Sequence, residues 1–184
     1  MRNNENITLV IGGCRSGKSS FALDAANGIP GDKKIFLATS VPTDPEMDKR
    51  VVRHQAERGK EWQTIEEPVM IHGVIEKTSK TAHVILVDCL TLWTSNLLFR
   101  EYDEARIMEA TLLLISALKE SSCPVFLVSN EVGYGIVPEN SLARQFRDFA
   151  GLVNQKIAAA ADRVVMTVAG IDLQIKPRVN ANKT

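Results

Sequence analysis

The chain has 184 residues, in which 22 Lys and Arg balance 22 Asp and Glu, and 45% of the residues are hydrophobic. That length and apolar content suit one compact domain with a single sizeable core. Nucleic-acid-binding proteins usually carry a basic surplus, so the balanced charge argues against that class. No apolar run approaches the roughly 18 residues of a membrane span, and the N-terminus lacks the apolar run of a signal peptide.

The three cysteines, Cys14, Cys89 and Cys123, are an odd number at no metal-ligand spacing. This usage is typical of reduced thiols, so we expect a soluble cytoplasmic protein. No linker or repeat divides the chain. We therefore expect one domain over residues 1–184, with residues 1–6 and 177–184 as flexible termini.

Short apolar runs alternate with helix-like segments along the chain. In chain order, the pattern predicts strand 7–11, helix 19–27, strand 34–39, helix 44–58, strand 83–88, helix 104–119, strand 124–129, helix 141–161 and strand 163–168. The strand segments are apolar without alternation, which is typical of parallel strands buried on both faces. Residues 171–176 do alternate, which suits an edge strand or an exposed tail. The order predicts a doubly wound α/β fold with right-handed crossovers.

A phosphate-binding motif follows the first predicted strand. It has the form G-x-x-x-x-G-K-[ST] and comprises Gly12, Gly13, Cys14, Arg15, Ser16, Gly17, Lys18 and Ser19. Its glycines permit close approach of backbone N–H groups to phosphates, and the next helix directs its positive end at them. We expect Lys18 to bridge the outer phosphates and Ser19 to offer its hydroxyl to Mg²⁺. The fold class predicted is thus a P-loop NTPase with a mostly parallel sheet flanked by helices.

A second acidic group is expected at the end of a neighbouring strand, where it would hold Mg²⁺ directly or through water. Asp88 closes the strand 83–88 and is the main candidate, although an Asp there can also cap a turn or helix. Glu131 is a weaker competitor. Residues 130–133 lack the Lys and Asp of a Ras-type guanine-binding segment, and no transporter signature occurs. The protein class that remains is a small enzyme that acts on a nucleotide and a small molecule.

His54 lies in the predicted helix 44–58, with Arg50 and Arg58 one turn away on either side. One interpretation is a histidine packed on a helix face. The other is a nucleophile whose imidazole attacks phosphorus while the two arginines steady the phosphate charge. His72, in a predicted surface helix, fits this role less well. His83 fits less well too, because it starts a strand at the end opposite the phosphate motif.

Several segments resemble the bifunctional adenosylcobinamide kinase/adenosylcobinamide-phosphate guanylyltransferase family of cobalamin biosynthesis, which has a RecA-like P-loop fold. They are GGCRSGKS (12–19), ATS (38–40), DPEMDKRVVRH (44–54), WQTIEEP (62–68), DCLTLWTSNLL (88–98) and the long block 130–170. The resemblance covers nearly the whole chain from Thr8 to Lys176. The block 130–170, which begins NEVGYGIVPEN, is far more specific than the P-loop.

The resemblance implies two reactions. ATP or GTP phosphorylates the aminopropanol hydroxyl of adenosylcobinamide, and GMP from GTP then passes through a guanylyl-histidine to the cobinamide phosphate. It implies catalytic roles for His54 and Lys18, and Mg²⁺ ligands at Ser19 and Asp88. The nucleotide contacts that it implies are residues 12–19, Ala38, Thr39, Ser40, Gln55, Ala56, Glu57, Arg58, Glu66 and Asp88. It also implies a homo-oligomer, with a homotrimer as the expected form.

Some assignments stay open at this stage. Arg144 and Arg147 can face phosphate or a neighbouring subunit, and Trp62, Trp93 and Tyr134 can pack on a corrinoid or in the core. Two other functions also remain: a P-loop kinase of another small alcohol with His54 inert, and a nucleotide-dependent switch module.

Overall fold

The computed structural model describes residues 6–40 and 59–177. Its strands are β1 (Ile7–Gly12), β2 (Lys34–Ala38), β3 (Trp62–Glu66), β4 (Val84–Asp88), β5 (Val125–Asn130), β6 (Arg163–Val168) and β7 (Ile171–Lys176). Its helices are α1 (Lys18–Asn27), α3 (Ile71–Thr78), α4 (Leu90–Phe99), α5 (Glu104–Lys119) and α6 (Ser141–Ala160). Within these ranges no helix combines the length and the apolarity that crossing a membrane requires.

The strands form one seven-stranded sheet in the order β3-β2-β4-β5-β1-β6-β7. All neighbouring pairs are parallel except β6 and β7, which run antiparallel. The predicted edge strand 171–176 is β7. The predicted α/β fold with a mostly parallel sheet flanked by helices is therefore confirmed.

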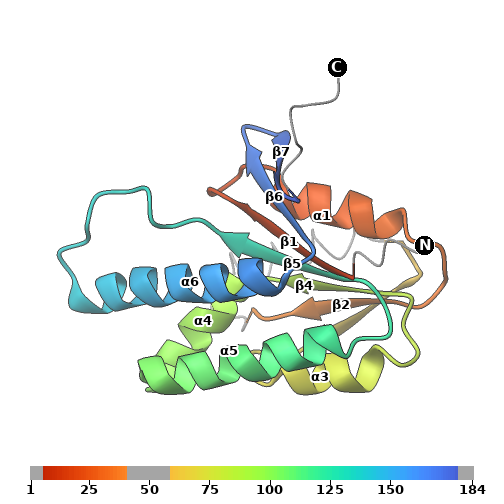
Figure 1. Ribbon diagram of the computed structural model, residues 1–184, viewed down its shortest axis with the longest axis horizontal. Helices are drawn as coiled ribbons and strands as arrows, with labels where there is room; N and C mark the ends of the chain where they lie inside the picture. The colour runs from red at the N-terminus through yellow and green to blue at the C-terminus, as the bar shows by residue number, and fades with distance from the viewer. Residues whose placement is uncertain (1–5, 41–58, 178–184) are drawn as a thin grey trace.

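Helices cover both faces of the sheet (Figure 1). One core cluster packs the odd-numbered residues of β4 and β5 beneath α3, α4, α5 and α6, and it contains the fully buried Trp93. A second, smaller cluster packs the even-numbered residues of the same strands against Ala22 and Ala26 of α1. Because both faces are covered, the central strands are apolar throughout, which is why their sequences do not alternate.

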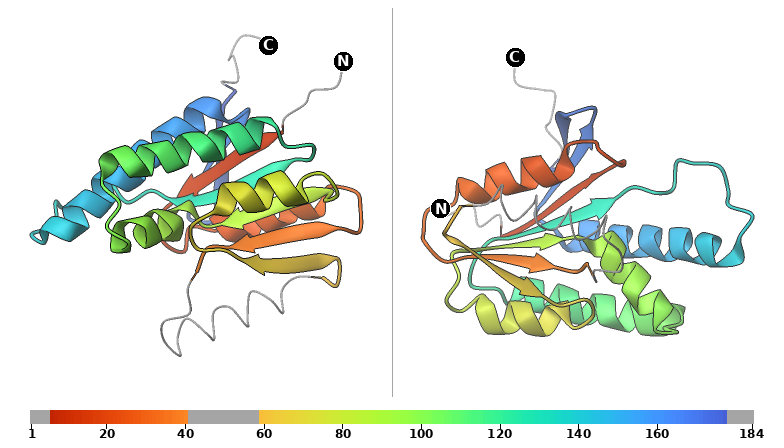
Figure 2. Two further views of the ribbon diagram at one scale, coloured as in Figure 1. Left: turned by 90° about the horizontal axis from the view of Figure 1, so that it is seen from below. Right: turned by 180° about the vertical axis from the view of Figure 1, so that it is seen from behind.

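Every parallel strand ends at the same edge of the sheet, and the P-loop connects β1 to α1 there. The connection 131–140 between β5 and α6 also leaves this edge. It extends well beyond the strand ends before α6 returns along the sheet (Figures 1 and 2). In open α/β sheets ligands bind outside this carboxyl edge, so the fold directs attention to it.

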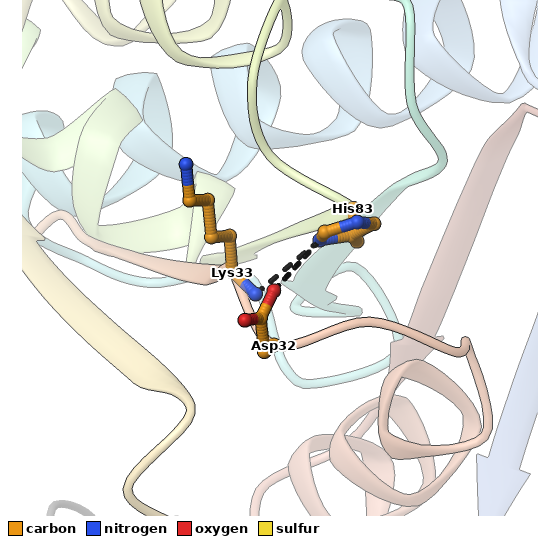
Figure 3. A network of polar contacts seen from close by, with 3 residues as sticks. All are labelled: Asp32, Lys33 and His83. Atoms are coloured by element: carbon orange, nitrogen blue, oxygen red, sulfur yellow. Dashed lines mark hydrogen bonds and ion pairs between the residues drawn. The ribbon is translucent and has the colours of Figure 1, made fainter.

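The opposite edge contains His83, as its position before β4 predicts. Its Nδ1 accepts a 3.3 Å hydrogen bond from the Lys33 N–H and lies 3.9 Å from Asp32 Oδ1 (Figure 3). The ring also fills the space beside Gly31, where a Cβ atom would come within 2.1 Å of it. His83 therefore packs a turn at the amino edge and is remote from the P-loop.

Two elements were not predicted. Helix α4 buries five of its ten residues and has no polar stripe, so its sequence lacks helical periodicity. Strand β3 pairs only with β2 and is mostly half-buried, so it lacks the apolar run of the central strands. The predicted helix 44–58 and most of the predicted flexible termini lie outside the described residues.

Candidate active site

The P-loop is held by one side chain of β6 and by one backbone N–H of the turn that follows β6. Ser16 Oγ and Thr167 Oγ1 of β6 share a buried 2.7 Å hydrogen bond, and the Gly170 N–H donates to the Ser16 carbonyl at 2.9 Å. A Cβ atom at Gly12 would come within 2.6 Å of both Ser16 and Thr167. Only glycine fits where the loop leaves β1.

The second glycine allows the loop to enter α1. Gly17 has φ of 99° and is the N-cap of α1, and Arg15 is also in the left-handed region with φ of 56°. Left-handed residues turn successive N–H groups toward one concavity, the arrangement that binds anions. Lys18 Nζ donates a 3.0 Å hydrogen bond to the Gly13 carbonyl across this concavity. The loop therefore has the geometry of a phosphate cradle.

Asp88 ends β4 on the same face of the sheet as the P-loop. Val84 and Leu86 of β4 pack in the cluster under α1, so strand alternation directs Asp88 to that face as well. The hydroxyl of Ser19, in the first turn of α1, and this carboxylate are hard oxygen donors of the kind Mg²⁺ prefers. Among the described residues no cluster of three or more acidic, His or Cys side chains forms a dedicated metal cage. The oxygens of Ser19 and Asp88, together with substrate phosphates, make a ligand set that suits Mg²⁺ bound to a nucleotide.

The carboxyl end of β2 is fixed to β4 through Thr39 and Cys89. The Thr39 hydroxyl donates to the Cys89 carbonyl at 2.8 Å and accepts from the Cys89 N–H at 2.9 Å. Asn96 of α4 donates to the carbonyls of Thr39 and Pro68. Thr39, which the resemblance places along the nucleotide, thus uses its hydroxyl in a structural contact at the end of β2.

Cys89 is a neutral thiol in this setting. Burial, followed by the negative charge of Asp88, raises the pKa of its thiol from the ordinary 9.0 to about 12. Burial also raises the pKa of Cys123. Cys14, in contrast, is exposed in the P-loop. Only this cysteine is available to reagents in the folded chain.

The other predicted residues are distributed along the sheet edge. Ala38 and Ser40 lie at the end of β2, while the exposed Glu66 ends β3, four strands from β1. Strand spacing places β3 about 19 Å from the P-loop strand. His54 and residues 55–58 lie outside the described residues.

The aromatic alternatives are partly resolved by burial. Trp93 is fully buried and its Nε1 donates to the Val69 carbonyl at 2.7 Å, so it is a core residue. Trp62 lies at the amino end of β3, packs edge-on against Phe36 and donates to Asn27. Tyr134 is 82% exposed in the connection 131–140. Of the three, only Tyr134 projects near the carboxyl edge.

Two polar residues at the site escaped prediction. Thr167 holds the P-loop, and Asn130 ends β5 beside it in register with Gly12. Both lie in the block 130–170 that carries the family resemblance, but no spacing within that block assigns them to the phosphate site. Only the strand order, which brings β5 and β6 to either side of β1, reveals them.

Comparison with known proteins gives the family. Residues 8–175 match the family described as cobinamide kinase/cobinamide phosphate guanyltransferase. The chain belongs to this family. It is therefore a bifunctional cobinamide kinase and cobinamide-phosphate guanylyltransferase, and the alternatives of another kinase or a switch module are excluded. The resemblance identified from residues 12–170 is confirmed.

Curated relatives match this chain over nearly their whole length. CobP of Pseudomonas aeruginosa, called a bifunctional adenosylcobalamin biosynthesis protein, is 39% identical over 170 residues, covering 91% of this chain and 96% of the relative. CobU proteins of Escherichia coli and Salmonella typhimurium, with the same description, are 40% and 41% identical, each covering 91% of this chain and 98% of the relative.

A solved structure supports the fold. The flagellar accessory protein FlaH from Methanocaldococcus jannaschii aligns with a TM-score of 0.52 at 12% identity, covering 94% of this chain and 78% of that chain. At this identity the likeness concerns the fold alone. Together with the sheet order and the P-loop after β1, it confirms the RecA-like P-loop class for this CobU-family chain.

Proposed function

We propose that this CobU-family chain carries out both reactions of adenosylcobalamin biosynthesis with nucleotide held by residues 12–19. ATP or GTP phosphorylates adenosylcobinamide, and GTP then supplies GMP through a guanylyl group carried by His54. The main observation that supports this proposal is the phosphate cradle. In it, Gly12 leaves no room for a Cβ atom and Gly17 has positive φ. The carboxylate of Asp88 on the same face adds the second acidic group that P-loop chemistry uses.

In the kinase reaction the aminopropanol hydroxyl attacks the γ-phosphorus. An O–P bond forms, the bond from the γ-phosphorus to the bridging oxygen breaks, and nucleoside diphosphate departs while the hydroxyl proton is released. Lys18 and the N–H groups of the loop neutralise the charge that grows on the phosphate oxygens. Lys18 leaves its contact with the Gly13 carbonyl to do so.

In the guanylyl reaction an imidazole nitrogen of His54 attacks the α-phosphorus. A P–N bond forms, the bridge between α- and β-phosphates breaks, and pyrophosphate leaves as the imidazole loses its proton. The cobinamide phosphate then attacks the same phosphorus, which breaks the P–N bond and gives adenosylcobinamide-GDP. The other proposed nucleotide contacts are Ala38, Thr39, Ser40, Gln55, Ala56, Glu57, Arg58 and Glu66.

Ser19 and Asp88 would hold Mg²⁺, which supplies charge neutralisation at the phosphates when bound. Both residues offer hard oxygens, and the P-loop N–H groups hold the phosphate oxygens that complete the coordination. The donor set fits Mg²⁺ and does not resemble a Cys or His site for zinc.

We also propose a homo-oligomer, in the form of a homotrimer, in the cytoplasm. Val168, Ile171, Leu173 and Ile175 of the β6–β7 hairpin are exposed at the sheet edge. Alternation directs Ile171 and Leu173 to one face, which suits burial by another subunit. Cys14, Cys89 and Cys123 are all unpaired, in keeping with a reducing compartment.

The shared phosphate site is tested with Lys18→Ala. We expect kcat/KM of this variant to fall at least ~100-fold, both for phosphorylation of cobinamide and for guanylyl transfer to cobinamide phosphate. Lys33→Ala, at the amino edge, is the matched control and should retain both rates. A variant at Lys18 that loses one activity and keeps the other would show that the two reactions use separate phosphate sites.

A further inference from the structure

Arg147 lies on the inward-facing stripe of α6, beyond the carboxyl edge of the sheet. Seven residues make nearly two whole turns, so Arg147 shares this stripe with Asn154. Asn154 is buried, and its Nδ2 donates a 3.0 Å hydrogen bond to the carbonyl of Asn130 at the end of β5. Because α6 returns along the sheet from outside the edge, Arg147 stands about 10 Å farther out than Asn154 (Figure 1).

The guanidinium group of Arg147 has no partner in the described part of the chain. Its Nη1 is buried without a hydrogen bond, and no carbonyl or carboxylate among residues 6–40 and 59–177 pairs with the group. The residue as a whole is only half-buried, so an anion can approach the group from its open side. A cation withdrawn from water is costly unless a negative charge compensates it. We therefore look for that charge in a ligand.

Arg144, the other arginine that the sequence left open, is used by the protein itself. Its Nη1 donates hydrogen bonds to the carbonyls of Pro138 and Glu139. These bonds attach the end of the connection 131–140 to the first turns of α6. Arg144 thus has a structural role, whereas Arg147 remains available to an anion.

The position of Arg147 favours the anionic group of the second substrate over the nucleotide. The phosphate cradle lies directly at the strand ends, where the P-loop leaves β1 at Gly12. A nucleotide fills that cradle, so a second substrate has to approach from outside the edge, where Arg147 stands. The second substrate of a cobinamide-phosphate guanylyltransferase carries one phosphate group of its own. That phosphate is the anion that Arg147 suits.

We propose that Arg147 binds the phosphate group of adenosylcobinamide phosphate during guanylyl transfer. This inference rests on the proposed function, in which His54 carries the guanylyl group. An oxygen of the acceptor phosphate attacks the α-phosphorus and a P–O bond forms. The P–N bond breaks, and its electron pair returns to the His54 nitrogen, which takes up a proton. The planar guanidinium can hold two oxygens of the acceptor phosphate, which lowers the repulsion between the two phosphate groups that must meet.

The two half-reactions of guanylyl transfer separate acceptor binding from nucleotide binding. The parent and Arg147→Ala are first incubated with Mg²⁺ and GTP labelled at the α-phosphate, without corrinoid, and formation of the protein adduct is timed. Cobinamide phosphate below saturation is then added, and loss of the label from the protein is timed. Arg147→Ala should form the adduct within about twofold of the parent rate but discharge it at least about tenfold more slowly, as expected for lost hydrogen bonds to a charged group. Equal discharge rates would overturn the proposal.

The phosphorylation reaction gives a second comparison, because cobinamide has no phosphate on its aminopropanol arm. In Arg147→Ala the KM for cobinamide should stay within about twofold of the parent value, while the KM for cobinamide phosphate in guanylyl transfer should rise about tenfold. A similar rise in both KM values would mean that Arg147 supports the site without recognising the phosphate, which contradicts the proposal.

Lys156→Ala is the matched control on the same helix. Lys156 is exposed, and nine residues, or two and a half turns, place it on the side of α6 opposite Arg147. This variant also removes one positive charge and should keep the parent rates. Arg147→Lys keeps the charge but loses the planar fork, so its discharge rate should lie between those of the parent and Arg147→Ala. A rate no faster than that of Arg147→Ala would count against the contact.

The same measurements distinguish the ways in which the account can fail. If the parent forms no adduct on His54, the proposed function and this inference both fail. If the adduct forms and Arg147→Ala discharges it as fast as the parent, only the inference on Arg147 fails. A smaller mass of Arg147→Ala in light scattering would show that Arg147 pairs with a neighbouring subunit. A lower melting temperature with slowing of both half-reactions would show a structural role, and either result contradicts the proposal.

Discussion

Ser16 of the P-loop and Thr167 of β6 share a buried 2.7 Å hydrogen bond between residues 151 positions apart. The bond fixes the floor of the phosphate cradle to a strand that the loop does not adjoin in sequence. Replacing one partner leaves the other hydroxyl buried without its bond, which costs about 1–3 kcal/mol, whereas removing both costs less.

Thr167→Val should therefore lower the free energy of unfolding by about 1–3 kcal/mol and weaken nucleotide binding. The double variant Ser16→Ala/Thr167→Val should lose less stability than the sum of the two single variants. Urea unfolding of the parent, the two single variants Ser16→Ala and Thr167→Val, and the double variant measures this coupling. Strict additivity would mean that the two hydroxyls do not interact.

Cys14 provides a direct report of nucleotide binding. It is the exposed cysteine of the chain and lies within the P-loop, while Cys89 and Cys123 are buried. A thiol reagent should modify one cysteine quickly, and GTP with Mg²⁺ should slow that reaction by occupying the cradle. Peptide mapping identifies the labelled residue, and Cys14→Ser serves as the control. Equal labelling rates with and without nucleotide would argue that the loop binds no phosphate.

The thiol of Cys89 predicts a loss of stability in alkali. Its pKa is about 12 in the folded chain and near 9.0 when unfolded, so the folded state disfavours its thiolate. The contribution of the neutral Cys89 thiol to the free energy of unfolding is complete below about pH 9. It is lost as pH rises from 9 toward 12. Between about pH 8 and pH 10, unfolding free energy should fall by about 1 kcal/mol more in the parent than in Cys89→Ala. Matching pH profiles of the two proteins would refute this.

The apolar face of β7 predicts an assembly interface. Ile171 and Leu173 are 72% and 60% exposed. Leu173→Glu should dissociate the proposed trimer, because a charge would be buried at the contact. Leu112→Glu, on the exposed side of α5, is the control and should retain the assembly. Light scattering of the parent and both variants measures the mass, and dissociation by Leu112→Glu alone would move the interface to α5.

Much of this arrangement is local and was predicted. The unbroken apolar runs of β1, β2, β4, β5 and β6 predict buried parallel strands, and the glycines and Lys18 of residues 12–19 predict the cradle between β1 and α1. Their signals are local because a buried strand and a phosphate loop need particular residues at adjacent positions. Helix α4 lacks such a signal because it is buried on most sides.

The remaining site depends on which strands are neighbours. Thr167 and Asn130 flank the P-loop because β6 and β5 lie beside β1, an order that no local pattern encodes. Thr39 has a structural role that its sequence context does not reveal. Its hydroxyl makes two hydrogen bonds to the main chain of Cys89, 50 residues away. Such roles emerge only when the tertiary contacts are known.

The central claim is that one histidine carries the guanylyl group. The most direct measurement is peptide mapping by mass spectrometry after incubation with GTP and Mg²⁺ but without corrinoid. We expect a single acid-labile guanylyl adduct on the peptide containing His54, its loss on addition of cobinamide phosphate, and no adduct in His54→Asn, which should still phosphorylate cobinamide. An adduct on another residue, or full guanylyl transfer by His54→Asn, would contradict the account.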